Sequence, residues 1–223
     1  RPGMETMIKP DLTKTHPWAF RSRVVPVIVV SDPAQAVPLA HALLAGGIDV
    51  MEITLRHAAG LPGIEAVARA VPAMHVGAGT VTRPTEMRQV REAGATFALS
   101  PGLTPELHQA AQDQGLPFMP GVMTPSEAMR ARDWGYGTVK LFPAAQAGGL
   151  AMVKAWAGPL SDIMLCPTGG VSVANLSEFL SQPNVAMVGG SWLVPLHLVE
   201  AGDWSAITAL ADEASAIAQS VTP

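Results

Sequence analysis

The sequence predicts a single α/β domain in which strands and helices alternate, and the expected architecture is a (β/α)8 TIM barrel with a short N-terminal extension. Short apolar runs recur about every 20 to 26 residues, which is the spacing of βα units. Stretches with helical periodicity lie between these runs. The 223 residues, 48% of them hydrophobic, suffice for one domain of this size with a substantial core. An open doubly wound sheet is the alternative.

The barrel is expected over residues 24–223, after an extension over residues 1–23. In that extension the first three residues are interpreted as a tag remnant, and a helix is expected after them. The first strand is predicted in residues 24–30 (VVPVIVV). Ser31 and Asp32 then offer an N-cap followed by Pro33, and the alanine-rich helix ends at Gly46 and Gly47.

The remaining strands and helices follow in the same alternation. The strands are expected to start near Asp49, His75, Phe97, Pro117, Thr138, Ile163 and Val185. Two helices are indicated by apolar residues that share a face, namely Ile64, Val67, Ala68 and Val71, and Ile207, Leu210, Ala211 and Ala214, the latter preceded by the N-cap candidate Asp203. A capping box from Thr124 to Glu127 indicates the start of another helix. Glycines at 94, 115 and 135 are expected to close helices before the next strand. Together they make about eight βα units.

Composition limits the classes of function. The single cysteine, Cys166, excludes an internal disulfide framework and suits a reducing compartment, so a cytoplasmic location is expected. No apolar run approaches the roughly 18 residues of a membrane span, and no secretory signal is recognised at the start. The net charge of -4 disfavours nucleic acid as a partner. The expected partner is a small molecule held by local groups.

Lys140 stands in the middle of an apolar run, residues 138–144 (TVKLFPA). A strand buried on both faces consists of continuous hydrophobic residues, so a charged side chain at its centre is paired, kept neutral or used in chemistry. Burial disfavours the charged form of an amine, and an unprotonated amine can attack a carbonyl to form a Schiff base. Lys140 is therefore a candidate covalent catalyst. The alternative is a lysine that only pairs with a carboxylate or an anion.

Glu52 and Arg56 are candidates for the same site. In residues 49–56 (DVMEITLR) the period of two places Glu52, Thr54 and Arg56 on one face and apolar residues on the other. The polar face is expected to point into the barrel, near the carboxyl ends of the strands, where barrel enzymes carry their chemistry. A purely structural salt-bridge network is the alternative, although such a network costs several kcal/mol of desolvation.

Paired glycines follow the seventh and eighth predicted strands. One turn, PTGGVS, contains Thr168, Gly169 and Gly170, and the other, VGGSW, contains Gly190 and Ser191. Glycine lets backbone amides approach an anion closely, and a helix N-terminus adds a favourable dipole. The two turns therefore predict a phosphate site, against the alternative of ordinary tight turns.

Three further features bear on the mouth of the barrel. Thr80 ends the third strand, where its hydroxyl can reach a carboxylate, with a plain strand-end turn as the alternative. His57, beside Arg56, is expected at the rim as a loop residue. No close grouping of His, Cys, Asp and Glu has the spacing of metal ligands, so catalysis without a metal and without a cofactor is expected.

These residues together carry a resemblance. The motifs VVPVIVV, GGIDVMEITLR, VGAGTV, SPGLT, MPGVMTPSE, VKLFPA, CPTGGV and VGGSWLVP, in this order over residues 24–195, resemble the 2-keto-3-deoxy-6-phosphogluconate (KDPG) aldolases, also described as 4-hydroxy-2-oxoglutarate (KHG) aldolases. The resemblance implies a class I, metal-independent aldehyde-lyase of carbohydrate metabolism, in the Entner-Doudoroff pathway. It also implies a (β/α)8 barrel that associates as a homotrimer.

The resemblance assigns roles to residues. Lys140 matches the Schiff-base lysine and Glu52 the glutamate that moves protons. Residues matched to the pyruvate end are Arg56, Thr80, Pro101 and Phe142, and those matched to the phosphate end are Thr168, Gly169, Gly170 and Ser191. The sequence departs from the family pattern at two positions: Gln146 stands where glutamate is frequent, and His57 stands where threonine is common. These departures put the substrate preference in doubt, but not the chemistry.

The expected reaction is cleavage of KDPG to pyruvate and D-glyceraldehyde 3-phosphate, with KHG, cleaved to pyruvate and glyoxylate, as a further substrate. Three alternatives stay open. They are an aldolase for the galactonate epimer, a phosphate-binding barrel isomerase or epimerase in which Lys140 stays non-covalent, and a ligand-binding barrel without catalysis.

Overall fold

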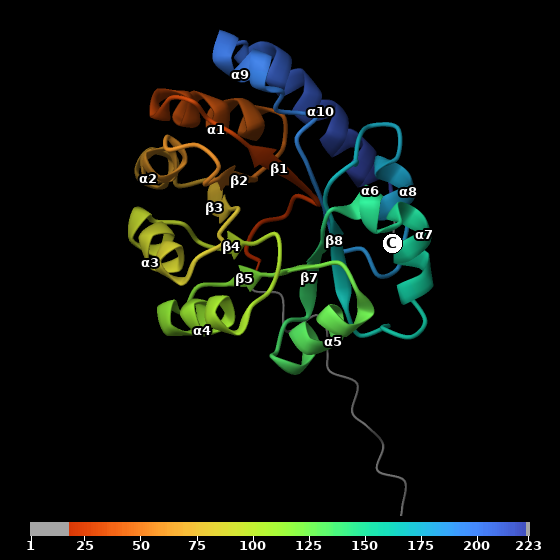
Figure 1. Cartoon of the computed structure of the whole chain (residues 1–223). Coiled ribbons are helices and arrows are strands. Elements are labelled where there is room, and N and C mark those ends of the chain that lie inside the picture. Colours follow the sequence, from red (N-terminus) through yellow and green to blue (C-terminus); the bar gives the residue numbers. More distant parts are fainter. Residues whose placement is uncertain (1–17, 222–223) are drawn as a thin grey trace, which may run out of the picture.

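The computed structural model describes residues 18–221, in which short parallel strands form the centre and helices surround them (Figure 1). The strands are β1 Val24–Ile28, β2 Val50–Thr54, β3 His75–Gly79, β4 Ala98–Leu99, β5 Phe118–Met119, β6 Gly121–Val122, β7 Thr138–Leu141, β8 Met164–Pro167 and β9 Val188–Gly190. They start within a few residues of the predicted positions. The helix expected in the N-terminal extension lies outside the described residues.

All strand pairs are parallel, and they form a curled sheet in two hydrogen-bonded parts. One part is six-stranded, in the order β5-β4-β3-β2-β1-β9, and the other is three-stranded, in the order β6-β7-β8. Pro120 alone separates β5 from β6, because proline has no N–H to give to the ladder. Its carbonyl still accepts from Lys140 N at 2.9 Å. The fold is a single α/β domain with one curled parallel sheet.

Helices cover the outside of the sheet (Figure 1). They are η1 Pro33–Gln35 (a 3-10 turn), α1 Ala36–Ala45, α2 Gly60–Ala70, α3 Pro84–Ala93, α4 Pro105–Gln114, α5 Pro125–Asp133, α6 Ala144–Ala147, α7 Gly149–Trp156, α8 Leu176–Leu180, α9 Leu196–Ala201 and α10 Trp204–Ser220. Among the described residues, no helix is long and apolar enough to cross a membrane.

The predicted helix caps are confirmed. Asp32 accepts from Ala34 N, Thr124 and Glu127 form a capping box, and Asp203 accepts from Ala206 N. Gly94 and Gly115 end α3 and α4 in the left-handed conformation. The N-caps set where their helices start after the preceding strand, and so they help to set the positions of the loops at the carboxyl edge of the sheet.

The core lies on both faces of the strands, as a parallel sheet requires. Nearly every strand residue is buried, and most of these residues are aliphatic. The buried polar exceptions are Glu52, Thr54, Ser100, Thr138, Lys140, Thr168 and Asn184. Glu52, Thr54, Lys140 and Thr168 lie on or next to β2, β7 and β8, in the carboxyl-terminal half of each strand. Polar groups in such a core need a partner or a function.

Candidate active site

The centre of the candidate site is a buried ion pair between β7 and β2. Lys140 Nζ lies 3.3 Å from Glu52 Oε1, and the two residues are 3% and 1% exposed. The same amine lies 4.9 Å from the centroid of the Phe142 ring. Both side chains therefore point into the sheet interior, as the period of two in the sequence predicts. Neither charge has direct access to bulk water.

Small neighbours make room for this pair. On β3, a Cβ at Gly79 would overlap Glu52 Oε1 and would lie 2.8 Å from Glu52 Cδ. Lys140 is in register with Gly121 on β6 and with Cys166 on β8. Burial raises the pKa of the Cys166 thiol to about 12, although the Thr168 hydroxyl and the charge of Lys140 act in the opposite direction. The thiol beside the lysine is thus a neutral neighbour.

A cavity of about 270 Å³ opens next to the pair, at the carboxyl ends of the strands. It is lined by Val27, Arg56, Phe142, Thr168, Gly169, Gly170, Val171, Gly190 and Ser191. Seven of these residues were selected from the sequence: Arg56, Phe142, Thr168, Gly169, Gly170, Gly190 and Ser191. The fold therefore brings the two glycine turns, Phe142 and Arg56 around one space.

Arg56 and Thr80 meet at the rim of this cavity. Arg56 Nε donates to Thr80 Oγ1 at 3.2 Å, and Thr80 has a φ of 58°, a left-handed conformation that few non-glycine residues adopt. Arg56 is exposed because it lies beyond the end of β2, and it lines the cavity, whereas Glu52 and Lys140 lie deeper in the strands. An always-charged, planar guanidinium at a cavity rim suits a carboxylate ligand.

Pro101 occupies the turn after β4 and does not line the cavity. It is exposed, and its backbone packs so closely on Gly121 that a Cβ there would overlap it. Because Gly121 is in register with Lys140, Pro101 lies one strand away from the lysine. The hydroxyl of the preceding residue, Ser100, donates to the Gly102 carbonyl and so holds the turn.

The first glycine turn differs from the expectation in one respect. Gly169 and Gly170 have φ values of 100° and 81°, which favour glycine, but α8 starts only at Leu176. Asn175 fills the gap, since its Oδ1 accepts from Ser172 N and its Nδ2 donates to the Gly170 carbonyl. The loop backbone rather than a helix N-terminus is therefore next to the cavity. The second turn, at Gly190, is likewise separated from α9.

Two polar residues near the site received no role from the sequence. Thr54 is 1% exposed, and its hydroxyl has no partner among the described residues. Its inward position on the polar face of β2 was expected from the sequence, but no role was assigned to it. His57 is exposed, and its Nδ1 accepts from Ala59 N at 3.0 Å, so its ring helps to start α2.

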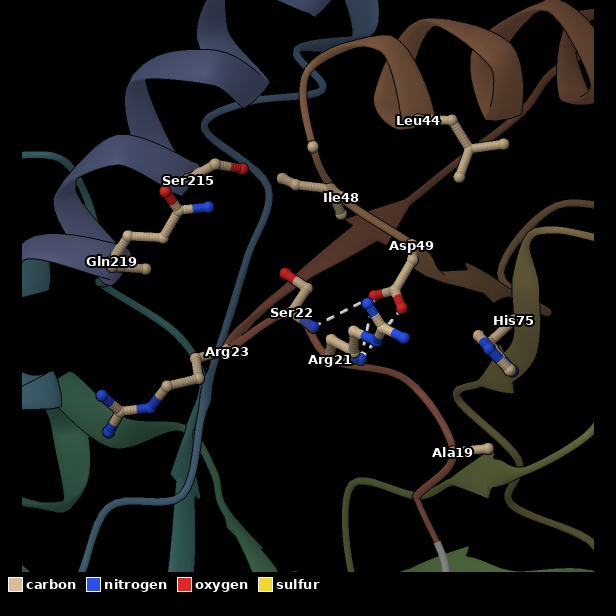
Figure 2. Close-up of a pocket in the computed structure, with 12 residues that line it drawn as sticks. Ala19, Arg21, Ser22, Arg23, Leu44, Ile48, Asp49, His75, Ser215 and Gln219 are labelled. Carbon is tan, nitrogen blue, oxygen red and sulfur yellow. Dashed lines mark hydrogen bonds between the residues drawn. The ribbon is translucent and has the colours of Figure 1, made fainter.

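A larger cavity, of about 620 Å³, lies at the opposite, amino end of the strands (Figure 2). There Asp49 accepts hydrogen bonds from the backbone N–H groups of Arg21 and Ser22, and His75, whose backbone N–H donates to the Asp49 carbonyl, lies beside it. Parallel α/β proteins carry their chemistry at the carboxyl ends of the strands. Moreover, this cavity has no buried pair like that of Lys140 and Glu52. We therefore place the site at the smaller cavity.

Within residues 18–221, no group of three or more His, Cys, Asp or Glu side chains is arranged to hold a metal ion.

Fold and site define a class: parallel α/β enzymes that hold a buried lysine beside a carboxylate at the carboxyl edge of the sheet, an arrangement typical of Schiff-base chemistry. The family model for KDPG and KHG aldolase matches residues 19–210. The chain belongs to this aldolase family, as its sequence motifs had indicated.

Relatives agree with the match. The 2-dehydro-3-deoxy-phosphogluconate aldolase of Pseudoalteromonas atlantica is 52% identical over 193 residues, which are 86% of this chain and 90% of the relative. The KHG/KDPG aldolase of Escherichia coli is 50% identical over 191 residues, with the same shares. The structure of the Legionella pneumophila KDPG aldolase, with pyruvate captured as a covalent carbinolamine intermediate, superimposes with a TM-score of 0.85 at 46% identity, covering 87% of this chain and 94% of that one.

Proposed function

We propose that this protein is a class I aldolase that cleaves KDPG to pyruvate and D-glyceraldehyde 3-phosphate. The observation that carries the proposal is the 3.3 Å contact between the buried Lys140 Nζ and Glu52 Oε1, beside a cavity rimmed by Arg56 and two glycine turns. A lysine held in an apolar interior next to one carboxylate can pass its proton to that carboxylate and attack a ketone. The covalent carbinolamine of the Legionella relative supports this reading.

The proposed reaction begins with attack of Lys140 Nζ on C2 of the keto acid, which gives a carbinolamine. Loss of water gives an iminium ion. Glu52 then takes the proton of the C4 hydroxyl while the C3–C4 bond breaks, and the bonding electrons move into the iminium to form an enamine. The aldehyde leaves, the enamine carbon is protonated, and water releases pyruvate and the free amine.

The remaining site residues bind the two acidic ends of the substrate. The pyruvate end is assigned to Arg56, Thr80, Pro101 and Phe142, with the Arg56 guanidinium on the carboxylate. The phosphate end is assigned to Thr168, Gly169, Gly170, Gly190 and Ser191, where loop N–H groups and hydroxyls supply donors. Seven of these residues line the same cavity, which supports the assignment: Arg56 and Phe142 from the pyruvate end, and Thr168, Gly169, Gly170, Gly190 and Ser191 from the phosphate end.

A second substrate, KHG, is included in the proposal, with pyruvate and glyoxylate as its products. It shares the pyruvate portion with KDPG and lacks the phosphate. The name of the Escherichia coli relative, KHG/KDPG aldolase, supports this extension. We expect weaker binding of KHG, because its second acidic group is a carboxylate at C5, which extends less far towards the glycine turns than a phosphate on C6 does.

The proposed architecture is a closed (β/α)8 barrel over residues 24–223, behind an extension over residues 1–23. Two isolated parallel bridges support closure: Leu165 pairs with Val185, and Thr168 pairs with Gly189, which links β8 to the strand region of β9. At the other junction, β5 and β6 are successive pieces of one strand interrupted at Pro120. Counting β5 and β6 as one strand gives the eight strands of this fold.

We further propose a homotrimer that acts in the cytoplasm. Large apolar side chains stand exposed on the surface at Met123, Met129, Val173 and Leu196, and such residues are candidates for subunit contacts. The single, buried cysteine suits a reducing compartment. Light scattering coupled to size exclusion tests the subunit number, and a mass of one or two chains would overturn the trimer.

Borohydride trapping tests the catalytic proposal. Incubation with pyruvate and borohydride should leave one covalent adduct on the peptide that contains Lys140, and cleavage of KDPG should be lost in Lys140→Met. The matched control is Lys154→Met, which removes an exposed lysine of α7 and should retain both signals. Wild-type cleavage without an adduct, or an active Lys140→Met variant, would refute the Schiff-base assignment.

A further inference from the structure

Two buried oxygens in the site have no hydrogen-bond partner among the described residues. They are Glu52 Oε2 and Thr54 Oγ1, and both residues are 1% exposed. Glu52 Oε1, in contrast, is bound to Lys140. Buried polar atoms in native proteins are nearly always paired, with protein groups or with ordered water. Two unpaired atoms on neighbouring positions of one strand face therefore call for a common explanation.

The geometry of β2 and β3 places these two oxygens close to each other. Thr54 is in register with Gly79, and a Cβ at Gly79 would lie 2.8 Å from Glu52 Cδ. Adjacent strands are about 4.8 Å apart, so the Glu52 carboxylate lies over the strand neighbour of Thr54, on the face of the sheet that carries the Thr54 side chain. One water molecule between the Thr54 hydroxyl and Glu52 Oε2 would give both buried oxygens a partner.

We infer that Thr54 is a positioning residue, whose hydroxyl holds Glu52 Oε2 through one buried water. The inference rests on the proposed function, in which Glu52 moves protons. Fixing Oε2 leaves Oε1, the oxygen nearest Lys140, as the one that exchanges protons with the substrate. A hydroxyl suits this task because it both donates and accepts, so it serves the ionised and the protonated carboxyl alike.

The effect belongs to proton transfer rather than to binding. Arg56 and the glycine turns hold the two ends of the substrate, and Thr54 contacts neither of them in the proposed arrangement. Loss of the hydroxyl should therefore slow proton transfer at C3 and leave the amine of Lys140 able to form its adduct.

The test compares Thr54→Val, Thr54→Ser and a control, Thr138→Val. Thr138 is another buried threonine, 6% exposed, at the amino end of β7. Exchange of the pyruvate methyl protons with D2O, followed by NMR, reports protonation of the enamine carbon. We expect Thr54→Val to slow exchange and to lower kcat for KDPG by about ten- to a hundredfold. KM and the final yield of borohydride adduct should stay close to those of the wild type.

Thr54→Ser should restore exchange to within about threefold of the wild type, because the hydroxyl returns. The Thr138→Val variant should exchange the pyruvate methyl protons at the wild-type rate. Wild-type exchange in Thr54→Val would overturn the inference, and so would a serine variant as slow as the valine variant, which would point to packing. If the wild type itself gives neither adduct nor exchange, the proposed function fails instead.

Discussion

Lys140 and Glu52 neutralise each other in a place where water reaches neither. Removing a charged pair from water costs several kcal/mol per ion, and a single 3.3 Å contact returns only part of that cost. The pair is thus a weak source of stability. The proposed function accounts for its retention in the interior, because an amine and a carboxylate can perform chemistry together once a ketone arrives.

Cys166 lies beside this pair and yields a prediction about reactivity. Burial raises the pKa of its thiol to about 12, so at pH 8 only about one molecule in 10⁴ carries the reactive thiolate. We expect iodoacetamide to leave Cys166 unmodified in the folded protein for hours and to alkylate it rapidly in urea. Mass spectrometry measures both reactions. Rapid alkylation of the folded protein at pH 8 would show that the thiol is accessible or ionised.

At the scale of elements, two glycines of β3 face different neighbours, so their substitution should affect different properties of the protein. A Cβ on Gly79 would strike the Glu52 carboxylate, whereas a Cβ on Gly77 would strike the Phe97 ring. We expect Gly79→Ala to reduce kcat by at least about tenfold while the protein stays folded, because only a side chain in the site has to move. Gly77→Ala should mainly lower the free energy of unfolding, by about 1 to 3 kcal/mol.

Steady-state kinetics and urea unfolding of both variants check this contrast. Equal losses of activity in the two variants, or unfolding of Gly79→Ala with no specific effect on kcat, would contradict it.

Helix α5 carries a pH-dependent contribution to stability. Burial by itself would raise the pKa of the Glu127 carboxyl, but hydrogen bonds from Met123 N, Thr124 Oγ1 and Thr124 N together hold it below its ordinary value. A lowered folded-state pKa stabilises the fold above the unfolded pKa of about 4.3, and this stabilisation is lost as the pH falls through the folded pKa.

Glu127→Gln should therefore be less stable than the wild type at pH 7, by about 0.5 to 1 kcal/mol, and the difference should shrink towards pH 3. Urea unfolding at several pH values measures it. Glu106→Gln is the control, because α4 is capped by Thr104, whose hydroxyl accepts from Leu107 N. A difference that grows at acid pH would contradict the assignment.

The caps could be predicted from the sequence because each depends on a few adjacent residues, as with Thr124 and Glu127. The strand ends could not be predicted as well. β4 has only two residues, and Val185, predicted to start a strand, makes only an isolated bridge ahead of β9. Pairing depends on neighbours distant in sequence, and local periodicity does not contain them. The lack of a partner for the Thr54 hydroxyl among the described residues was not predicted for the same reason.

For the whole molecule, Arg23 joins the start of β1 to the segment ahead of β9. Its guanidinium donates to the carbonyls of Ala186, Leu180 and Val185, and it points away from Asp49 (Figure 2). We expect Arg23→Met to lower the free energy of unfolding by at least about 2 kcal/mol, because buried carbonyls lose charged donors.

The matched control for Arg23 is Arg21→Met. Arg21 is exposed, and its hydrogen bonds to Asp49 come from the backbone, so the variant should stay close to the wild type. Urea unfolding of both variants measures the difference in stability. Equal stability of the two would show that Arg23 does not stabilise the closure of the sheet.

The alternation of βα units and the positions of most site residues could be predicted, because the apolar runs and the glycine turns are local signals. The junction of β8 with β9 could not, since the two bridges involve Leu165 and Thr168 in a pairing that no pattern announces. The end of the sheet that carries the site was predicted, and Lys140 and Glu52 lie together there. The larger cavity at the amino end was not predicted, because it is formed by residues far apart in the sequence.

The amine and the carboxylate of the pair are separated by 88 positions along the chain, and the glycine turns follow later still. Under the proposed function, a polypeptide emerging from the ribosome is expected to stay inert towards keto acids until almost all of it has been synthesised. The time at which aldolase activity first appears in a cell-free translation reaction should therefore report when the fold is complete.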